Sequence, residues 1–122
     1  MTGLQTILKP PQTATIDANG LAVLMRSGVP FELVDARSDC ESEEGLPGAR
    51  HLTTKSSRSE IESVLGPKET LVVTYCSSPE CPASMRLGEH LRSMGYENVL
   101  EFKGGIAEWK QAGFPTDDRC CR

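Results

Sequence analysis

Short apolar runs alternate with amphipathic segments along this chain of 122 residues, and the alternation limits the folds that it can adopt. Each run is short and rich in β-branched or aromatic residues, which is typical of strands, whereas the segments between them place apolar side chains at helical spacing. Strands separated by helices indicate βαβ crossovers. We therefore expect an α/β fold, with a central, mainly parallel five-stranded sheet covered by helices on both faces. The predicted strands are 13–16, 31–36, 49–52, 71–75 and 98–102, and the predicted helices follow Asp17, span 59–65, begin at Ala83 and follow Gly105.

The length suits a single domain with one core. Lys9-Pro10-Pro11 ends the N-terminal segment, and Gly113 and Pro115 close the domain. We expect a flexible leader at 1–12, one domain at 13–116 and a mobile tail at 117–122.

The net charge and the hydropathy of the chain argue against nucleic-acid and membrane partners and against a membrane span or a signal peptide. The formal net charge is −4, which gives no electrostatic reason to expect nucleic acid or an anionic membrane. No apolar run approaches the roughly 20 residues that span a bilayer. The first residues lack the basic and long apolar stretches of a signal peptide, so we expect the cytoplasm, where thiols stay reduced.

Five cysteines stand at positions 40, 76, 81, 120 and 121. Their odd number and irregular spacing argue against a structural disulfide framework, and the absence of paired CxxC motifs argues against a closed zinc site. Cys120 and Cys121 are interpreted as part of the tail, with sulfur acceptance or binding of a soft metal such as Cu(I) as alternatives. Cys40 falls in an acidic segment, 38–44, that is interpreted as a solvated loop or a docking surface for a basic partner.

Cys76 directly follows the most apolar predicted strand, and the loop after it leads into a helix. Backbone N–H groups converge where a strand, a tight loop and a helix N-terminus meet, which favours an anion such as a thiolate. Functional sites of parallel sheets lie beyond the carboxyl ends of the strands. Cys76 is therefore the candidate nucleophile. Asp35 and Arg37 lie at the carboxyl end of another predicted strand, at the same edge.

Several segments, taken in order, resemble the rhodanese-like (sulfurtransferase) domain family. One is similar to the family's Asp-x-Arg segment, one to its Pro-Gly-Ala turn, one to its nucleophile strand, and three to its closing elements. The resemblance covers roughly residues 12–116. The segments are Leu33-Val34-Asp35-Ala36-Arg37, Glu44-Gly45-Leu46-Pro47-Gly48-Ala49, Val72-Val73-Thr74-Tyr75-Cys76, Gly95-Tyr96-Glu97-Asn98-Val99, Lys103-Gly104-Gly105-Ile106-Ala107-Glu108-Trp109 and Gly113-Phe114-Pro115.

The resemblance implies a thiosulfate or polysulfide sulfurtransferase. In the family, the loop cysteine takes a sulfane sulfur from a donor, holds it as a persulfide and passes it to a thiol, cyanide or a partner protein. Carried over by position, Cys76 is this carrier, and the donor is polysulfide, thiosulfate or a protein persulfide. No metal or organic cofactor is implied. The backbone of the loop would bind the outer sulfur, so the candidate substrate-binding residues are Ser77, Ser78, Pro79, Glu80 and Pro82.

The loop departs from the family's pattern in length and charge. Ser84 best fits the residue that opens the helix, which makes the loop longer than the usual Cys-x-x-x-x-Arg. No Arg or Lys lies between Cys76 and Ser84, and Glu80 adds a negative charge. Thiosulfate is a dianion, so it should bind poorly unless other cations reach the loop, and polysulfide or a protein persulfide is the better donor. The nearby candidates are His51, Lys55, Arg58 and Arg86.

Three hypotheses compete for Cys81. It resolves the Cys76 persulfide, releasing sulfide and leaving a disulfide; it is itself the nucleophile; or it is a small buried apolar residue. Asp35 and Arg37 are interpreted as a structural ion pair near the site.

Two other functions remain open. One is a redox-sensing or non-catalytic binding module of the same fold. The other is a phosphatase or arsenate reductase, which uses Cys-x-x-x-x-x-Arg to clamp a tetrahedral oxyanion. Pro82 stands at that arginine position, so this activity is disfavoured.

Overall fold

The computed structural model describes residues 14–37 and 44–118. The predicted leader, Cys40, Cys120, Cys121 and the acidic segment up to residue 43 lie outside the described residues.

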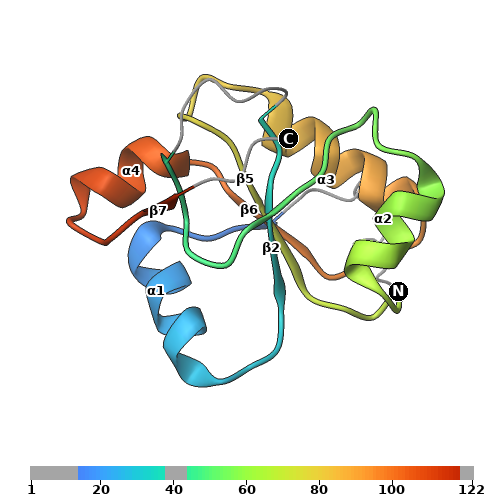
Figure 1. The fold of residues 1–122 in the computed structure, drawn as a ribbon, viewed down its shortest axis with the longest axis horizontal. Coiled ribbons are helices and arrows are strands. Elements are labelled where there is room, and N and C mark those ends of the chain that lie inside the picture. Colours follow the sequence, from blue (N-terminus) through green and yellow to red (C-terminus); the bar gives the residue numbers. More distant parts are fainter. Residues whose placement is uncertain (1–13, 38–43, 119–122) are drawn as a thin grey trace, which may run out of the picture.

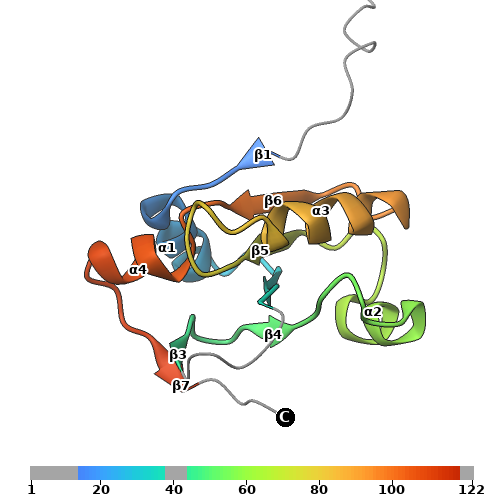
Figure 2. The same ribbon diagram turned by 90° about the horizontal axis from the view of Figure 1, so that it is seen from above.

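A five-stranded sheet forms the centre of the molecule, with the strand order β1-β6-β5-β2-β4. Every neighbouring pair is parallel, which confirms the predicted sheet. Figure 2 shows the strands following one another from β1 at the top to β4 near the bottom. The strands are β1 Ala14–Thr15, β2 Glu32–Asp35, β4 Arg50–His51, β5 Val72–Tyr75 and β6 Val99–Phe102.

Helices cover both faces of the sheet. α1 (Ala18–Ser27) and α4 (Gly105–Gln111) lie on one side, and α2 (Arg58–Leu65) and α3 (Ala83–Ser93) lie on the other (Figure 1). Each side buries its own apolar cluster. The first contains Leu21, Leu33, Val73, Tyr75, Phe102 and Trp109, and the second contains Val34, Leu52, Ile61, Val72, Leu87 and Leu91.

Polar side chains begin two of the helices. Asp17 accepts a hydrogen bond of 2.8 Å from the N–H of Gly20 at the start of α1, as the sequence predicts, and Ser57 accepts one from Glu60 at the start of α2. Pro82 precedes α3 and makes no such bond. The helix that follows the cysteine loop therefore begins without a side-chain cap.

A second sheet was not predicted. β3 (Glu44–Gly45) pairs antiparallel with β7 (Asp117–Asp118), the two residues at the start of the segment that the sequence analysis assigns to the tail. The Nζ of Lys110 lies 2.6 Å from Glu44 Oε1, and the hydroxyl of Thr116 donates to Glu44 Oε2. These contacts hold the end of the domain against β3. No helix among the described residues is long and apolar enough to cross a membrane.

Candidate active site

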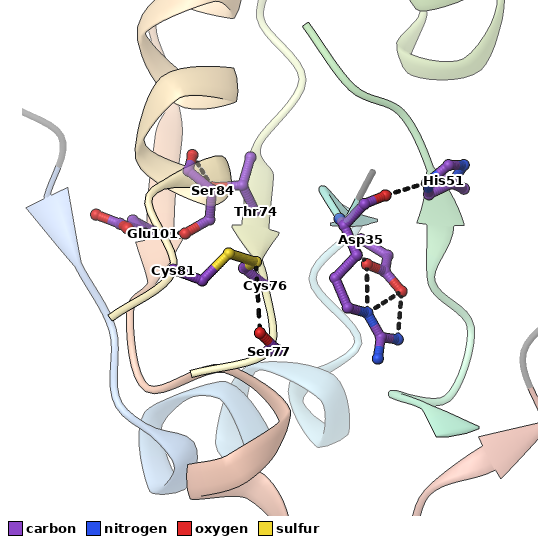
Figure 3. Close-up of a disulfide and its surroundings, with 9 residues drawn as sticks. Asp35, His51, Thr74, Cys76, Ser77, Cys81, Ser84 and Glu101 are labelled. Atoms are coloured by element: carbon purple, nitrogen blue, oxygen red, sulfur yellow. Dashed lines mark hydrogen bonds and ion pairs between the residues drawn. A yellow bond between two sulfur atoms is a disulfide. The ribbon is translucent and has the colours of Figure 1, made fainter. Parts of the chain in front are cut away.

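Cys76 lies directly after β5, a strand with a neighbour on each side and all four of its residues buried. The cysteine itself is only 2% exposed. A disulfide joins it to Cys81, five positions along the chain, with 6.3 Å between the two Cα atoms (Figure 3). The structure therefore brings both predicted thiols together at the carboxyl edge of the sheet.

The start of the loop is bound to α4. The N–H groups of Ile106 and Ala107 donate hydrogen bonds of 3.0 Å to the carbonyls of Cys76 and Ser77. This close approach requires a glycine at position 105, where φ is +66° and a Cβ atom would lie 2.5 Å from the carbonyl oxygen of Cys76. The predicted Gly-Gly turn thus shapes the cysteine loop.

The middle of the loop is a turn closed by a hydrogen bond from the N–H of Cys81 to the carbonyl of Ser78. Proline suits the second position of such a turn, where Pro79 stands. Pro79 and Glu80 are exposed. The N–H of Cys81 is thus used within the loop, and Pro79 and Pro82 have none to offer an outer sulfur.

A buried polar network holds the loop's other end. Thr74 Oγ1 donates to the carbonyl of Ser84 at 3.1 Å, and Ser84 Oγ donates to Glu101 Oε2 at 2.8 Å. All three residues are buried. The network joins β5, the first turn of α3 and β6. Figure 3 shows Thr74, Ser84 and Glu101 near the disulfide.

A cleft of about 370 Å³ opens beside Cys81. Its walls come from the end of β2, the segment after β4 and the first turn of α3. Of the four candidate cations, Lys55 and Arg86 line it, whereas Arg58 pairs with Glu62 at 3.7 Å and His51 Nε2 bonds to the carbonyl of Arg37. The lining residues are Ala36, Thr53, Thr54, Lys55, Cys81, Pro82, Ala83 and Arg86.

Asp35 and Arg37 form a buried ion pair, with 2.6 Å between Asp35 Oδ2 and Arg37 Nη2. The hydroxyl of Tyr75 donates to Asp35 Oδ2, and Arg37 also donates to the carbonyl of Glu44. Burial alone would lower the pKa of Arg37, but its hydrogen bond to Asp35 and the charge there outweigh burial and raise it. Burial and the Asp35 charge raise the pKa of Tyr75. This network supports the strand that carries Cys76 and does not line the cleft.

Within residues 14–37 and 44–118, His, Cys, Asp and Glu side chains do not gather in groups of three or more that could hold a metal ion.

The model of the rhodanese-like domain matches residues 17–112. The chain belongs to the rhodanese-like domain family. A sulfurtransferase of Allochromatium vinosum is 31% identical over 101 residues, which cover 82% of this chain and 91% of that protein. An uncharacterized protein of Synechocystis is 46% identical over 39 residues, and the match covers 30% of this chain and 22% of that protein. The solution structure of a rhodanese-like domain from Anabaena superimposes with a TM-score of 0.72 at 28% identity, covering 88% of this chain and 80% of that one. This rhodanese-like domain therefore has a relative of nearly matching length that is named a sulfurtransferase.

Some residues that build the site were not singled out from the sequence. Glu101 is a buried carboxylate within a strand, and Glu108 reaches from α4 to accept a hydrogen bond of 2.8 Å from the N–H of Ala18. A carboxylate at an inward position of the apolar strand 99–102 is the signal that could have revealed Glu101. Nothing local reveals Glu108, because its partner is 90 positions away.

Proposed function

We propose that the protein is a sulfurtransferase in which Cys76 carries a sulfane sulfur and Cys81 is the resolving thiol. The observation that carries this proposal is the disulfide between the two residues at the carboxyl edge of the sheet. Family membership and the relative named sulfurtransferase support it.

In the first step, the thiolate of Cys76 attacks the outer sulfur of the donor. The bond to the rest of the donor breaks, so sulfite leaves from thiosulfate and a shortened chain leaves from polysulfide. Cys76 is left as a persulfide. A thiol, cyanide or partner protein then takes the outer sulfur, and the electron pair returns to Cys76 as a thiolate.

Cys81 provides a second outcome for the persulfide. Its thiolate attacks the inner sulfur, the Sγ of Cys76, and the outer sulfur leaves as sulfide. The product is the Cys76–Cys81 disulfide present in the structure. We propose a cytoplasmic site of action, where abundant thiols would reduce the disulfide for another cycle.

Both small donors are candidate substrates. The loop itself carries Glu80 and no cation, which favours polysulfide or a protein persulfide over thiosulfate. Lys55 and Arg86 add positive charge beside Cys81, which supports binding of an anionic donor.

The test is mass spectrometry under non-reducing conditions, after the reduced protein has been incubated with polysulfide or with thiosulfate. We expect added sulfur on the Cys76 peptide, and more retained sulfur in Cys81→Ser because the resolving step is lost. Cys76→Ser should retain none. Sulfur loading that persists in Cys76→Ser would assign the carrier role to Cys81 and contradict the proposal.

A redox-sensing module is the alternative that the same disulfide favours. It requires a reduction potential near that of the cytosol and no sulfur transfer to any acceptor. Titration against glutathione redox buffers, combined with the sulfur-loading experiment, separates the two functions.

A further inference from the structure

The two sulfurs of the disulfide differ in access. Cys76 is 2% exposed, beneath the loop and α4, whereas Cys81 is partly exposed and lines the cleft. Thiol–disulfide exchange begins with attack on one particular sulfur, and access decides which one. A reagent that enters through the cleft meets Cys81.

The cleft is positively charged although the chain as a whole is not. Lys55 and Arg86 line it, no acidic residue does, and among the described residues neither cation forms an ion pair with a carboxylate. The N-terminus of α3, which lacks a side-chain cap at Pro82, adds the positive end of the helix dipole. An anion is therefore favoured in the cleft next to Cys81.

We propose that this cleft binds a small thiol bearing one or more carboxylates and that this thiol reduces the disulfide by attacking Cys81. A volume of about 370 Å³ suits a small molecule. Guanidinium and carboxylate groups match in geometry, so Arg86 and Lys55 hold the carboxylate while the thiolate reaches the sulfur.

Two molecules of thiol supply the two electrons that reduce the disulfide. The first thiolate forms a bond to Cys81 Sγ, the bond between the two cysteines breaks, and Cys76 leaves as a thiolate with Ser77 Oγ 3.9 Å from its sulfur. A second thiolate attacks the bound thiol's sulfur, releasing the oxidised thiol and the thiolate of Cys81. The reducing thiols lose two electrons and the protein gains two.

The inference concerns the disulfide alone and holds whether or not Cys76 carries sulfur, so its test is independent of sulfur loading. The oxidised protein is mixed with 3-mercaptopropionate, 2-mercaptoethanol or cysteamine, and each rate is divided by the rate of the same thiol with a small uncharged disulfide, which removes differences in thiol pKa and intrinsic nucleophilicity. We expect the anionic thiol to be about tenfold faster than the neutral one at low salt, and the cationic thiol to be slowest. The advantage should disappear in 1 M salt, where the Debye length is about 3 Å.

Two variants and a matched control locate the charge effect. In Lys55→Gln and Arg86→Gln, the ratio of the anionic to the neutral rate should fall severalfold. In Arg26→Gln, which removes an exposed cation at the last turn of α1, the ratio should stay at its original value. Far-UV circular dichroism establishes that each variant is folded.

Acid quenching at early times and peptide mapping identify the sulfur that is attacked. We expect the mixed disulfide on Cys81. An adduct on Cys76, equal rates for the three thiols, or a ratio unchanged by both cleft variants would overturn the proposal.

Discussion

At the scale of single residues, Gly105 determines how closely α4 can approach the cysteine loop. Its φ of +66° and its contact with the carbonyl of Cys76 are separate requirements. Gly113 also has a positive φ, of +86°, but nothing lies within 4 Å of an added Cβ at this position. The two glycines therefore allow backbone conformation and steric fit to be measured separately.

We expect Gly113→Ala to lower the free energy of unfolding by about 1–2 kcal/mol, the cost of a left-handed conformation for alanine. Gly105→Ala should cost about 1–3 kcal/mol more, because overpacking adds to that cost. Urea denaturation measures both, and sulfur loading should slow only in Gly105→Ala. Equal losses of stability would mean that the loop shifts freely to admit the methyl group.

At the scale of elements, an exposed ion pair between Lys110 and Glu44 joins α4 to β3. The hydrogen bond from Lys110 and then its charge lower the pKa of Glu44 from its ordinary value. A carboxyl whose pKa is lowered by folding contributes stability above its unfolded pKa and loses that contribution as the pH falls through the folded pKa.

Lys110→Met should therefore raise the pKa of Glu44 toward its ordinary value of 4.5. Carbon-13 NMR titration of the carboxyl groups measures the change. Glu62 is the internal control, since its pKa is lowered by Lys68 and should not respond. A Glu44 pKa that stays low in the variant would show that Lys110 is not the cause.

Predictability also differs from element to element. β5 and α3 could be predicted because a β-branched run and a helical spacing of leucines are local signals. The start of α1 followed from Asp17 for the same reason. β3 and β7 contain only two residues each, and none of these residues is β-branched. The two strands pair across more than seventy positions, so no local sequence pattern predicts them.

The candidate site shows the same division. The sequence predicts that Cys76 follows its strand and that Cys81 lies in the loop after it. That Lys55 and Arg86 line one cleft, while Arg58 pairs with Glu62, depends on how the segment after β4 packs beside α3. The spacing of residues along the sequence does not predict long-range packing of this kind.

At the scale of the whole molecule, the disulfide closes a short loop outside the two apolar clusters. Reduction should therefore lower stability without unfolding the domain. The chain-entropy relation gives about 2 kcal/mol for a loop of this size.

We expect a reducing agent to lower the Tm by roughly 6–10 °C and to leave the far-UV circular dichroism at room temperature unchanged. Scanning calorimetry measures the shift. The Cys76→Ser/Cys81→Ser double variant is the control and should not respond to the reducing agent. Loss of secondary structure on reduction would mean that the disulfide, and not the packing of the sheet, maintains the fold.

The bond between the loop and α4 also has an optical consequence. The N–H groups at the start of α4 hold the carbonyls of Cys76 and Ser77, and the same helix carries Trp109, the chain's single tryptophan. Its indole is buried against Phe102 and Phe114 and donates a hydrogen bond to the carbonyl of Pro115. A rearrangement of the cysteine loop would therefore act on the helix that carries the indole. We therefore expect the emission of Trp109 to change when the disulfide is reduced, so that fluorescence follows the state of the two sulfurs without a label.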